Sequence, residues 1–227
     1  MLIAFLKPRT MGGTTCSGLL TYALERAGYP VAAFDADESL QLLAWQRQAP
    51  DFPCEVVRAD TPAFAETVYP EMDPRRVAVV DTGHAENHPE IADSVLEVAD
   101  LVILVISPTE PDYTRLTKPA KGVPLAKMIK RSASLRDSGE APPTVALLNR
   151  CNSSSTKPGE YAALLRDGGT EGTLPKWDVL TTRIPLHVGI ANAVGAPCDR
   201  RDRKAPFDEL VTELRARKLL PAPEALA

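Results

Sequence analysis

The sequence predicts a doubly wound α/β fold, in which a mostly parallel β-sheet carries helices on both faces. Its short apolar runs are continuous rather than alternating, as in strands that are buried on both faces. Helical patterns separate these runs, so the chain alternates between strand and helix. The 227 residues are 44% hydrophobic and 25% charged, which suits one globular domain spanning residues 1–227.

The apolar runs are predicted as six strands. The first run is too short for the apolar core of a secretory signal, and no cationic segment precedes it. It is therefore expected to be a buried strand. In chain order the predicted strands cover residues 2–6, 30–34, 77–80, 101–106, 144–148 and 177–180.

Four helices are expected between and after these strands, over residues 15–27, 39–48, 92–99 and 207–219. The first is followed by Gly28, a helix-terminating signal. The last is amphipathic. Two stretches rich in Ser, Gly, Asp or Pro, residues 132–143 and 151–159, are predicted as loops.

Composition excludes several classes of protein. No apolar run approaches the ~20 residues that span a bilayer, and the apolar face of the last helix is too short for membrane targeting. A net charge of −4 excludes a histone-like polycation but not a local basic patch. The four cysteines lie far apart without a CxxC motif, so free thiols in a reducing cytoplasm are expected rather than a zinc site.

Polar residues follow the first three predicted strands at their carboxyl ends, where ligands bind in such sheets. The first strand leads into the turn 7–15, KPRTMGGTT, and then into a helix. A glycine-containing turn at a helix N-terminus presents N–H groups to an anion. The second strand ends with Asp35 and Asp37, and the third with Asp81. Together they predict a nucleotide–Mg²⁺ site. The alternative is an ordinary loop with aspartate helix caps.

The histidine and glutamate residues just past Asp81 offer a second interpretation as a metal site. Pro89 is expected to interrupt any helix there, and a solvated switch loop is the favoured interpretation. The residues concerned are His84, Glu86, His88 and Glu90.

Five ordered segments resemble the ParA/MinD family of deviant-Walker ATPases. They are FLKPR at 5–9 with the following Thr pair, GYPVAAFDADES at 28–39, VAVVDTG at 77–83, DLVILVISPTEPD at 100–112 and TTRIPLHVGIANAVGAP at 181–197. FDADE, Trp45 and CEVVRAD at 54–60 look most like the VirC-type proteins of conjugative transfer. The resemblance implies a P-loop NTPase-like fold that binds ATP and Mg²⁺.

The resemblance also assigns roles to individual residues. It implies that Asp37 positions the attacking water and that Arg9 reaches across a nucleotide-sandwiched homodimer. Mg²⁺ is held by Thr14 directly and by Asp81 through water. The residues implied in nucleotide binding are Gly12, Gly13, Thr14, Thr15, Asp35, Asn149, Arg150 and Pro185.

One departure from the family stands out, because a P-loop requires a lysine before its Ser/Thr residue to hold the phosphates. Here the turn reads TMGGTT. With the Thr pairs aligned, Gly13 takes the lysine's place and the loop is one residue short. In the other register Thr14 replaces that lysine. The first register is preferred, because loops absorb deletions more easily than helices. Lys7 or a lysine of a partner subunit is the replacement that the sequence offers.

Basic residues cluster late in the chain, where the family binds DNA without sequence preference. The predicted DNA-binding residues are Arg200, Arg201, Arg203, Lys204, Arg215 and Lys218. Another basic stretch covers residues 118–131. A charge run is also compatible with a merely solvated surface.

The function expected from the resemblance is that of a cytoplasmic, nucleoid-associated DNA-partition protein. Its partners are a second copy, DNA, and a DNA-bound adaptor protein of the ParB or transfer-complex kind. The alternatives are a pseudo-ATPase scaffold, suggested by the missing lysine, and an ATP-dependent enzyme acting on a small molecule.

Overall fold

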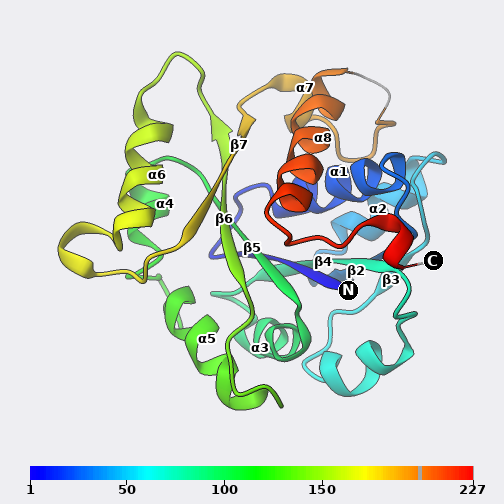
Figure 1. Ribbon diagram of the computed structural model, residues 1–227, viewed down its shortest axis with the longest axis horizontal. Helices are drawn as coiled ribbons and strands as arrows, with labels where there is room; N and C mark the ends of the chain where they lie inside the picture. Colours follow the sequence, from blue (N-terminus) through cyan, green and yellow to red (C-terminus); the bar gives the residue numbers. More distant parts are fainter. Residues whose placement is uncertain (199–200, 227) are drawn as a thin grey trace.

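The computed structural model describes residues 1–198 and 201–226, and across these residues seven strands form one parallel sheet (Figure 1). The strand order is β3-β2-β4-β1-β5-β6-β7. This confirms the predicted fold class. The strands are β1 (Leu2–Lys7), β2 (Val31–Ala36), β3 (Val56–Arg58), β4 (Val77–His84), β5 (Leu101–Ile106), β6 (Thr144–Cys151) and β7 (Asp178–Pro185).

The two central strands explain why the apolar runs are continuous. Every residue of β1 and β5 is buried, because helices cover both faces of the sheet. β5 has the predicted bounds. β2, β4, β6 and β7 extend beyond the predicted carboxyl ends, since polar residues such as Asp35 continue the ladder. β3 was not predicted, because it is three residues long and only Val56 is buried.

Helices pack on both faces (Figure 1). One hydrophobic cluster joins residues of α1, α2 and α8 to one face, and a second joins α3, α5 and α6 to the other. The helices are α1 (Gly13–Arg26), α2 (Gln41–Gln48), α3 (Pro89–Val98), α4 (Glu110–Thr114), α5 (Leu125–Ser132), α6 (Lys157–Asp167), α7 (Val188–Ala191) and α8 (Arg201–Ala216).

Helix α1 positions the loop after β1. It begins after Gly12, whose φ of 83° is left-handed and favours glycine, and Gly28 follows it with a φ of 86°. Most of its residues are buried. On one side Tyr22 contacts Phe52, whose ring also packs edge-on against the fully buried Trp45. The Trp45 indole N–H donates to the Ala196 carbonyl over 3.1 Å, so α2 and the segment before α8 are fixed together.

Several local predictions were wrong. Residues 132–143 include the end of α5 and a 3₁₀ turn, and α6 begins inside the predicted loop 151–159. Pro89 does not interrupt a helix but opens α3, because proline is tolerated in the first turn. The last helix begins at Arg201 rather than at residue 207 and carries Pro206 within its first turns.

Two expectations concern thiols and membranes. The four cysteines are free, and Cys16, Cys151 and Cys198 are buried. Among the described residues, no helix is long and apolar enough to cross a bilayer.

Candidate functional site

A cavity of about 550 Å³ opens at the carboxyl ends of β1, β2 and β4. Three segments that are far apart in sequence build it: the turn between β1 and α1, the residues after β2, and the end of β4. Its lining includes Lys7, Thr10, Gly12, Gly13, Thr14, Thr15, Asp37, Glu38, Ser39, Gln41, His84, Asn87, His88, Arg150, Ala191 and Val194. The volume is in the range of small-molecule sites.

The N-terminus of α1 faces this cavity. Its first-turn N–H groups lack intrahelical acceptors, as at every helix start, and no side chain caps them. Two features favour glycine at position 12: its φ is left-handed, and an added Cβ would lie 2.6 Å from Nδ2 of Asn149. Uncapped N–H groups at a positive helix end are suited to an anion such as a phosphate.

Thr14 and Lys7 line the cavity, and both contact the fully buried carboxylate of Asp81. The Thr14 hydroxyl donates to Oδ2 of Asp81 over 2.5 Å, and the Lys7 ammonium lies 2.6 Å from Oδ1 of the same carboxylate. The ammonium also donates to the Thr82 carbonyl over 3.0 Å. The side chains of Thr14, Asp81 and Lys7 are all buried. Their hydrogen bonds therefore hold the Lys7 ammonium and the Thr14 hydroxyl in fixed positions beside the Asp81 carboxylate.

Asp35 and Asp37 have different places, although they follow the same strand. Asp37 lines the cavity, 3.9 Å from the Lys7 ammonium. Burial acts to raise its pKa, but the Ser39 N–H and the Lys7 charge lower the pKa below its usual value. Asp37 is therefore ionised at neutral pH.

Asp35 is not among the residues that line the cavity, and its role in nucleotide binding stays a prediction. Its fully buried carboxylate accepts the backbone N–H groups of Asp37 and Leu43 and so shapes the turn into α2. Burial raises its pKa to about 6.

His84 closes the cavity beside Thr10, whose hydroxyl oxygen lies 3.2 Å from its Nε2. Burial, and then the positive charge of Lys7, hold the pKa of His84 below its usual value. The imidazole is therefore neutral at pH 7. Its neighbours have other partners: Glu86 pairs with Arg115 at 2.6 Å, and His88 with Glu38 at 3.1 Å.

A second, smaller cavity of about 100 Å³ adjoins the first. Gly12, Thr15, Arg150 and Ala191 line both. Its other lining residues are Asn149, Pro185, Leu186, His187 and Ile190. Asn149 donates to the Met11 carbonyl over 2.6 Å, and Arg150 adopts a left-handed φ of 58°. The shared lining residues place the two cavities side by side.

Arg9 lies outside the lining of both cavities. Its guanidinium forms an ion pair with Asp112 of α4, with Nε 2.8 Å from Oδ1. The side chain remains 42% exposed. A role across a homodimer stays a prediction.

The arrangement of oxygens around Thr14 fits Mg²⁺. This ion prefers oxygen ligands, keeps several waters, and is usually held by one or two carboxylates together with phosphates. Thr14 and Asp81 supply a hydroxyl and a carboxylate that already touch. Within the described residues no group of three His, Cys, Asp or Glu could hold a metal ion.

The predicted DNA-binding residues have different surroundings. Arg200 lies outside the described residues, and the side chain of Arg201 is not described. Arg203 contradicts the prediction, because it is only 8% exposed and donates to the carbonyls of Gly189, Pro197 and Asn192. It fixes the segment before α8.

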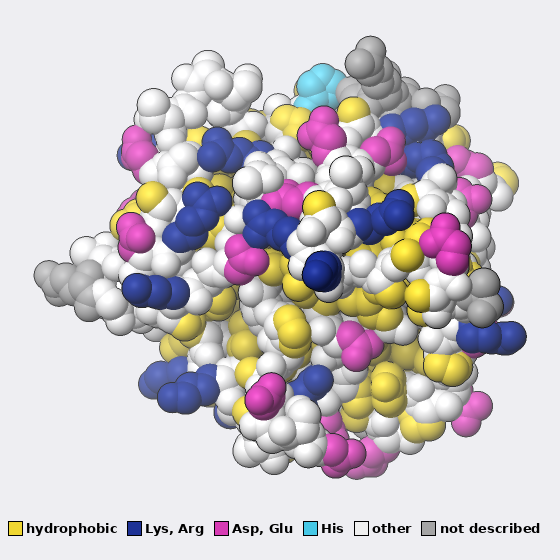
Figure 2. Space-filling model, in the orientation of Figure 1, with side chains coloured by type: hydrophobic (Ala, Val, Ile, Leu, Met, Phe, Trp, Pro, Cys, Tyr) yellow, Lys and Arg dark blue, Asp and Glu magenta, His cyan; other side chains and the backbone are white. Residues whose placement is uncertain are grey.

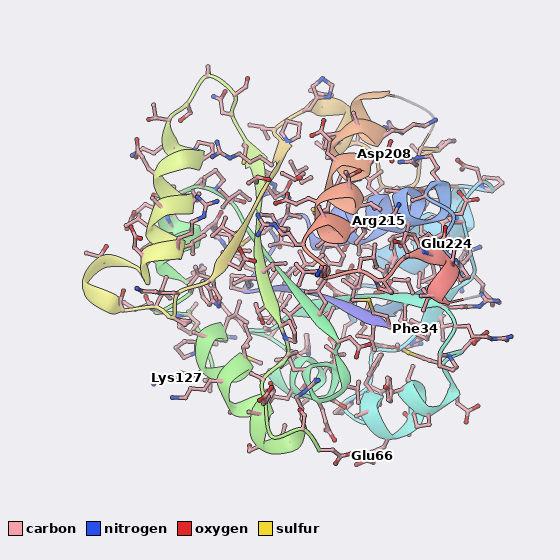
Figure 3. The ribbon with its side chains drawn as sticks, in the orientation of Figure 1. Phe34, Glu66, Lys127, Asp208, Arg215 and Glu224 are labelled. Carbon is pink, nitrogen blue, oxygen red and sulfur yellow. The ribbon has the colours of Figure 1, made fainter. Side chains whose placement is uncertain are left out.

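The remaining predicted cations are accessible. Arg215 and Lys218 are exposed and Lys204 is partly exposed. Figure 2 shows dark-blue cationic side chains across the middle of this face, with acidic side chains between them. Arg215 lies on α8, whereas Lys127 projects from α5 at a distant part of the molecule (Figure 3). The two basic regions are therefore separate surfaces.

Several lining residues were not predicted from the sequence. Glu38, Ser39 and Gln41 directly follow Asp37 in the chain, so their position after β2 was the available signal. Asn87 and Val194 gave no signal, because they enter the cavity from a turn and from the segment after α7.

Comparison with known proteins places this geometry in a known fold. No protein-family profile and no curated protein matches the sequence. Among solved structures, the ATP complex of a McdA variant from Cyanothece is similar with a TM-score of 0.67 and 12% identity over 94% of this chain and 96% of that chain. A protein assigned to plasmid partition in Borrelia burgdorferi, bound to AMPPNP, has a TM-score of 0.64 and 11% identity, covering 95% and 98%.

Two further similarities widen the range of functions. The septum site-determining protein MinD of Pyrococcus horikoshii, complexed with Mg-ADP, has a TM-score of 0.58 and 20% identity, covering 96% of this chain and 98% of that chain. A cobyrinic acid a,c-diamide synthase of Mycobacterium smegmatis, with ADP and magnesium, has a TM-score of 0.60 and 15% identity, covering 97% and 98%. The chain therefore has the fold of the ParA/MinD-type ATPases, a fold that also carries an enzyme.

Proposed function

We propose that this protein is a nucleotide-controlled DNA-partition protein of the ParA/MinD type. One observation carries the proposal: an uncapped helix N-terminus, the Thr14–Asp81 pair and a buried ammonium converge on one cavity. Each suits one part of Mg-ATP. Solved structures of the same fold contain AMPPNP, ATP or Mg-ADP.

The residues divide the nucleotide between them. The N–H groups of residues 12–15 bind the phosphates, and Thr14 and Asp81 hold Mg²⁺, which neutralises phosphate charge when bound. Asp37, ionised and on the cavity wall, orients a water. Asn149, Arg150 and Pro185 border the smaller cavity, which takes the base.

Association with a second copy follows from the same proposal. Leu186 and Val188 are 63% and 72% exposed beside the smaller cavity, so nucleotide binding and contact with a partner share one edge. In the homodimer Arg9 leaves Asp112 and reaches the phosphates of the second copy. Nucleotide thus controls association.

Binding to DNA uses Lys204, Arg215 and Lys218 and is directed to phosphates rather than to bases. A DNA-bound adaptor, of the partition or the conjugative-transfer kind, then acts on the nucleotide-bound dimer. This places the protein in the cytoplasm with the nucleoid. A non-hydrolysing scaffold and a small-molecule enzyme are the alternatives that the test separates.

The test is binding to a random-sequence DNA duplex, followed by fluorescence anisotropy with Mg-ATP, with Mg-ADP and without nucleotide. Light scattering on the same samples gives the mass of the protein. We expect DNA binding and a doubled mass with ATP only. DNA binding with the same affinity in all three conditions indicates the non-hydrolysing scaffold. No DNA binding under any condition contradicts the partition function and leaves the enzyme.

A further inference from the structure

Lys7 is a buried cation that has no counterpart in the P-loop motif. It is the last residue of β1 and only 2% exposed, yet it lines the larger cavity. Its ammonium contacts Asp81 at 2.6 Å and the Thr82 carbonyl at 3.0 Å. Among the described residues these contacts use two of its three N–H donors, so a third donor is available to a ligand.

The side chain of Lys7 lies over Gly13, the residue that stands where a P-loop has its phosphate lysine. A Cβ added at Gly13 would be 2.5 Å from Nζ and 2.8 Å from Cε of Lys7. The backbone at Gly13 is helical and not left-handed, so it would accept a side chain. Glycine is therefore required at position 13 because the Lys7 side chain leaves no room for a Cβ, and not because of the backbone conformation.

Charge gives a second reason for a cation at this point. Asp37 and Glu38 line the same cavity as the α1 N-terminus, and the buried Asp81 carboxylate lies next to it, in contact with Lys7 and Thr14. A triphosphate brought there without a compensating cation would be repelled by these negative charges. Lys7 is the buried cation of this cavity, whereas Arg150, which also lines it, is exposed.

We propose that Lys7 supplies the ammonium that binds the terminal phosphates of a nucleoside triphosphate, in place of a lysine at position 13. The inference rests on the proposed function. Lys7 and Gly13 then form a complementary pair: the cation comes from the strand before the loop, and the loop residue is small because that side chain crosses it. The shortened loop thus keeps its charge.

The test is calorimetric titration with Mg-ATP, and separately with inorganic tripolyphosphate, of folded wild type and variants. Lys7→Met removes the cation. Lys7→Ala with Gly13→Lys moves it to the loop, because truncation of Lys7 at Cβ removes the side-chain atoms that crowd position 13. Lys127→Met, an exposed lysine on α5, is the matched control for loss of one positive charge. Lys7→Gln, which removes the charge but keeps a polar N–H donor, serves if the methionine variant does not fold.

We expect Lys7→Met to weaken ATP and tripolyphosphate binding by roughly 10- to 100-fold, the value of a lost charge-assisted hydrogen bond. The double variant should recover most of this loss, and Lys127→Met should bind like wild type. Wild-type binding of ATP that is unchanged by loss of Lys7 overturns the inference but leaves the function. Tripolyphosphate binding that depends on Lys7, without ATP binding, overturns the proposed function and the nucleotide part of the inference, and leaves Lys7 as a ligand of inorganic polyphosphate only. No binding of either probe to the wild type overturns both.

Discussion

The Thr14 hydroxyl donates a hydrogen bond to the Asp81 carboxylate over 2.5 Å and so joins the first turn of α1 to β4. Both groups are buried. This contact brings together the two oxygen-bearing groups that suit Mg²⁺ with a phosphate.

Replacing Thr14 by Val should remove the magnesium-dependent part of nucleotide affinity. The shape is retained but the hydroxyl ligand is lost, so ATP should bind roughly tenfold more weakly with Mg²⁺ and unchanged with a chelator. Calorimetry under both conditions measures this. Thr21→Val, a buried threonine of the same helix whose hydroxyl donates to the Ser17 carbonyl, is the control. A Thr14→Val protein that keeps the magnesium effect would contradict the assignment.

Glu213 of α8 should stabilise the protein in a pH-dependent way. Its carboxylate accepts the N–H groups of Thr181 and Thr182, each over 2.7 Å, and pairs with Arg217. Burial raises its pKa, but the hydrogen bonds from Thr182 and Thr181 outweigh burial and lower the pKa to about 2. A lowered pKa means that this stability is present above the unfolded value near 4.5 and is lost as the pH falls through about 2.

Glu213→Gln should therefore cost on the order of 2 kcal/mol of unfolding free energy at pH 7, because glutamine leaves one N–H facing its amide group. By about pH 3 more than half of that difference should have disappeared. Urea unfolding at the two pH values measures it. Glu209→Gln, exposed on the same helix, should change little at either pH. An equal cost at both pH values would be evidence against the ionised hydrogen-bonded group.

Arg203→Ala should destabilise the protein rather than weaken DNA binding selectively. Three backbone carbonyls lose their guanidinium donor, which should lower the unfolding free energy by roughly 2–3 kcal/mol. Thermal unfolding measures the effect. Lys204→Ala, next in the chain and partly exposed, is the matched control and should leave stability unchanged. An Arg203→Ala protein as stable as the control would show that these contacts do not fix the segment.

Removing the accessible late cations should reduce the salt dependence of DNA binding. With Lys204, Arg215 and Lys218 replaced by Ala, the slope of log K against log salt should fall by about 3, one for each lost phosphate contact. Anisotropy titrations at several salt concentrations give the slope. Replacing Lys118, Lys121 and Lys127 removes equal charge from the separate α5 region. If that second set alone changes the slope, the DNA surface has been assigned to the wrong helix.

The strands at the centre of the sheet could be predicted because burial on both faces leaves an unbroken apolar run. β5, between Asp100 and Ser107, was predicted at its observed bounds. The edge strand β3 was missed because it has three residues and only Val56 is buried, and β7 was shortened because exposed residues interrupt its apolar pattern. An edge strand has one neighbour and less coverage, so its sequence carries a weaker signal.

The site was predictable where position along the strand decides it. Thr14 and Asp37 line one cavity, and Thr14 donates to Asp81, while their roles toward nucleotide and Mg²⁺ stay predictions. The surroundings of Asp35 and Arg203 could not be predicted, because the sequence does not reveal which polar side chains point inward and form hydrogen bonds with backbone groups. The path of Lys7 over Gly13 likewise depends on packing between segments.

The central claim, that the cavity binds a nucleotide with Mg²⁺ and distinguishes ATP from ADP, is tested most directly by calorimetric titration of the purified wild-type protein. Mg-ATP is titrated first, and Mg-ADP serves as the comparison. The proposal predicts ATP binding tighter than about 100 μM, with a different affinity for ADP. A folded protein that gives no heat at millimolar ATP would contradict it.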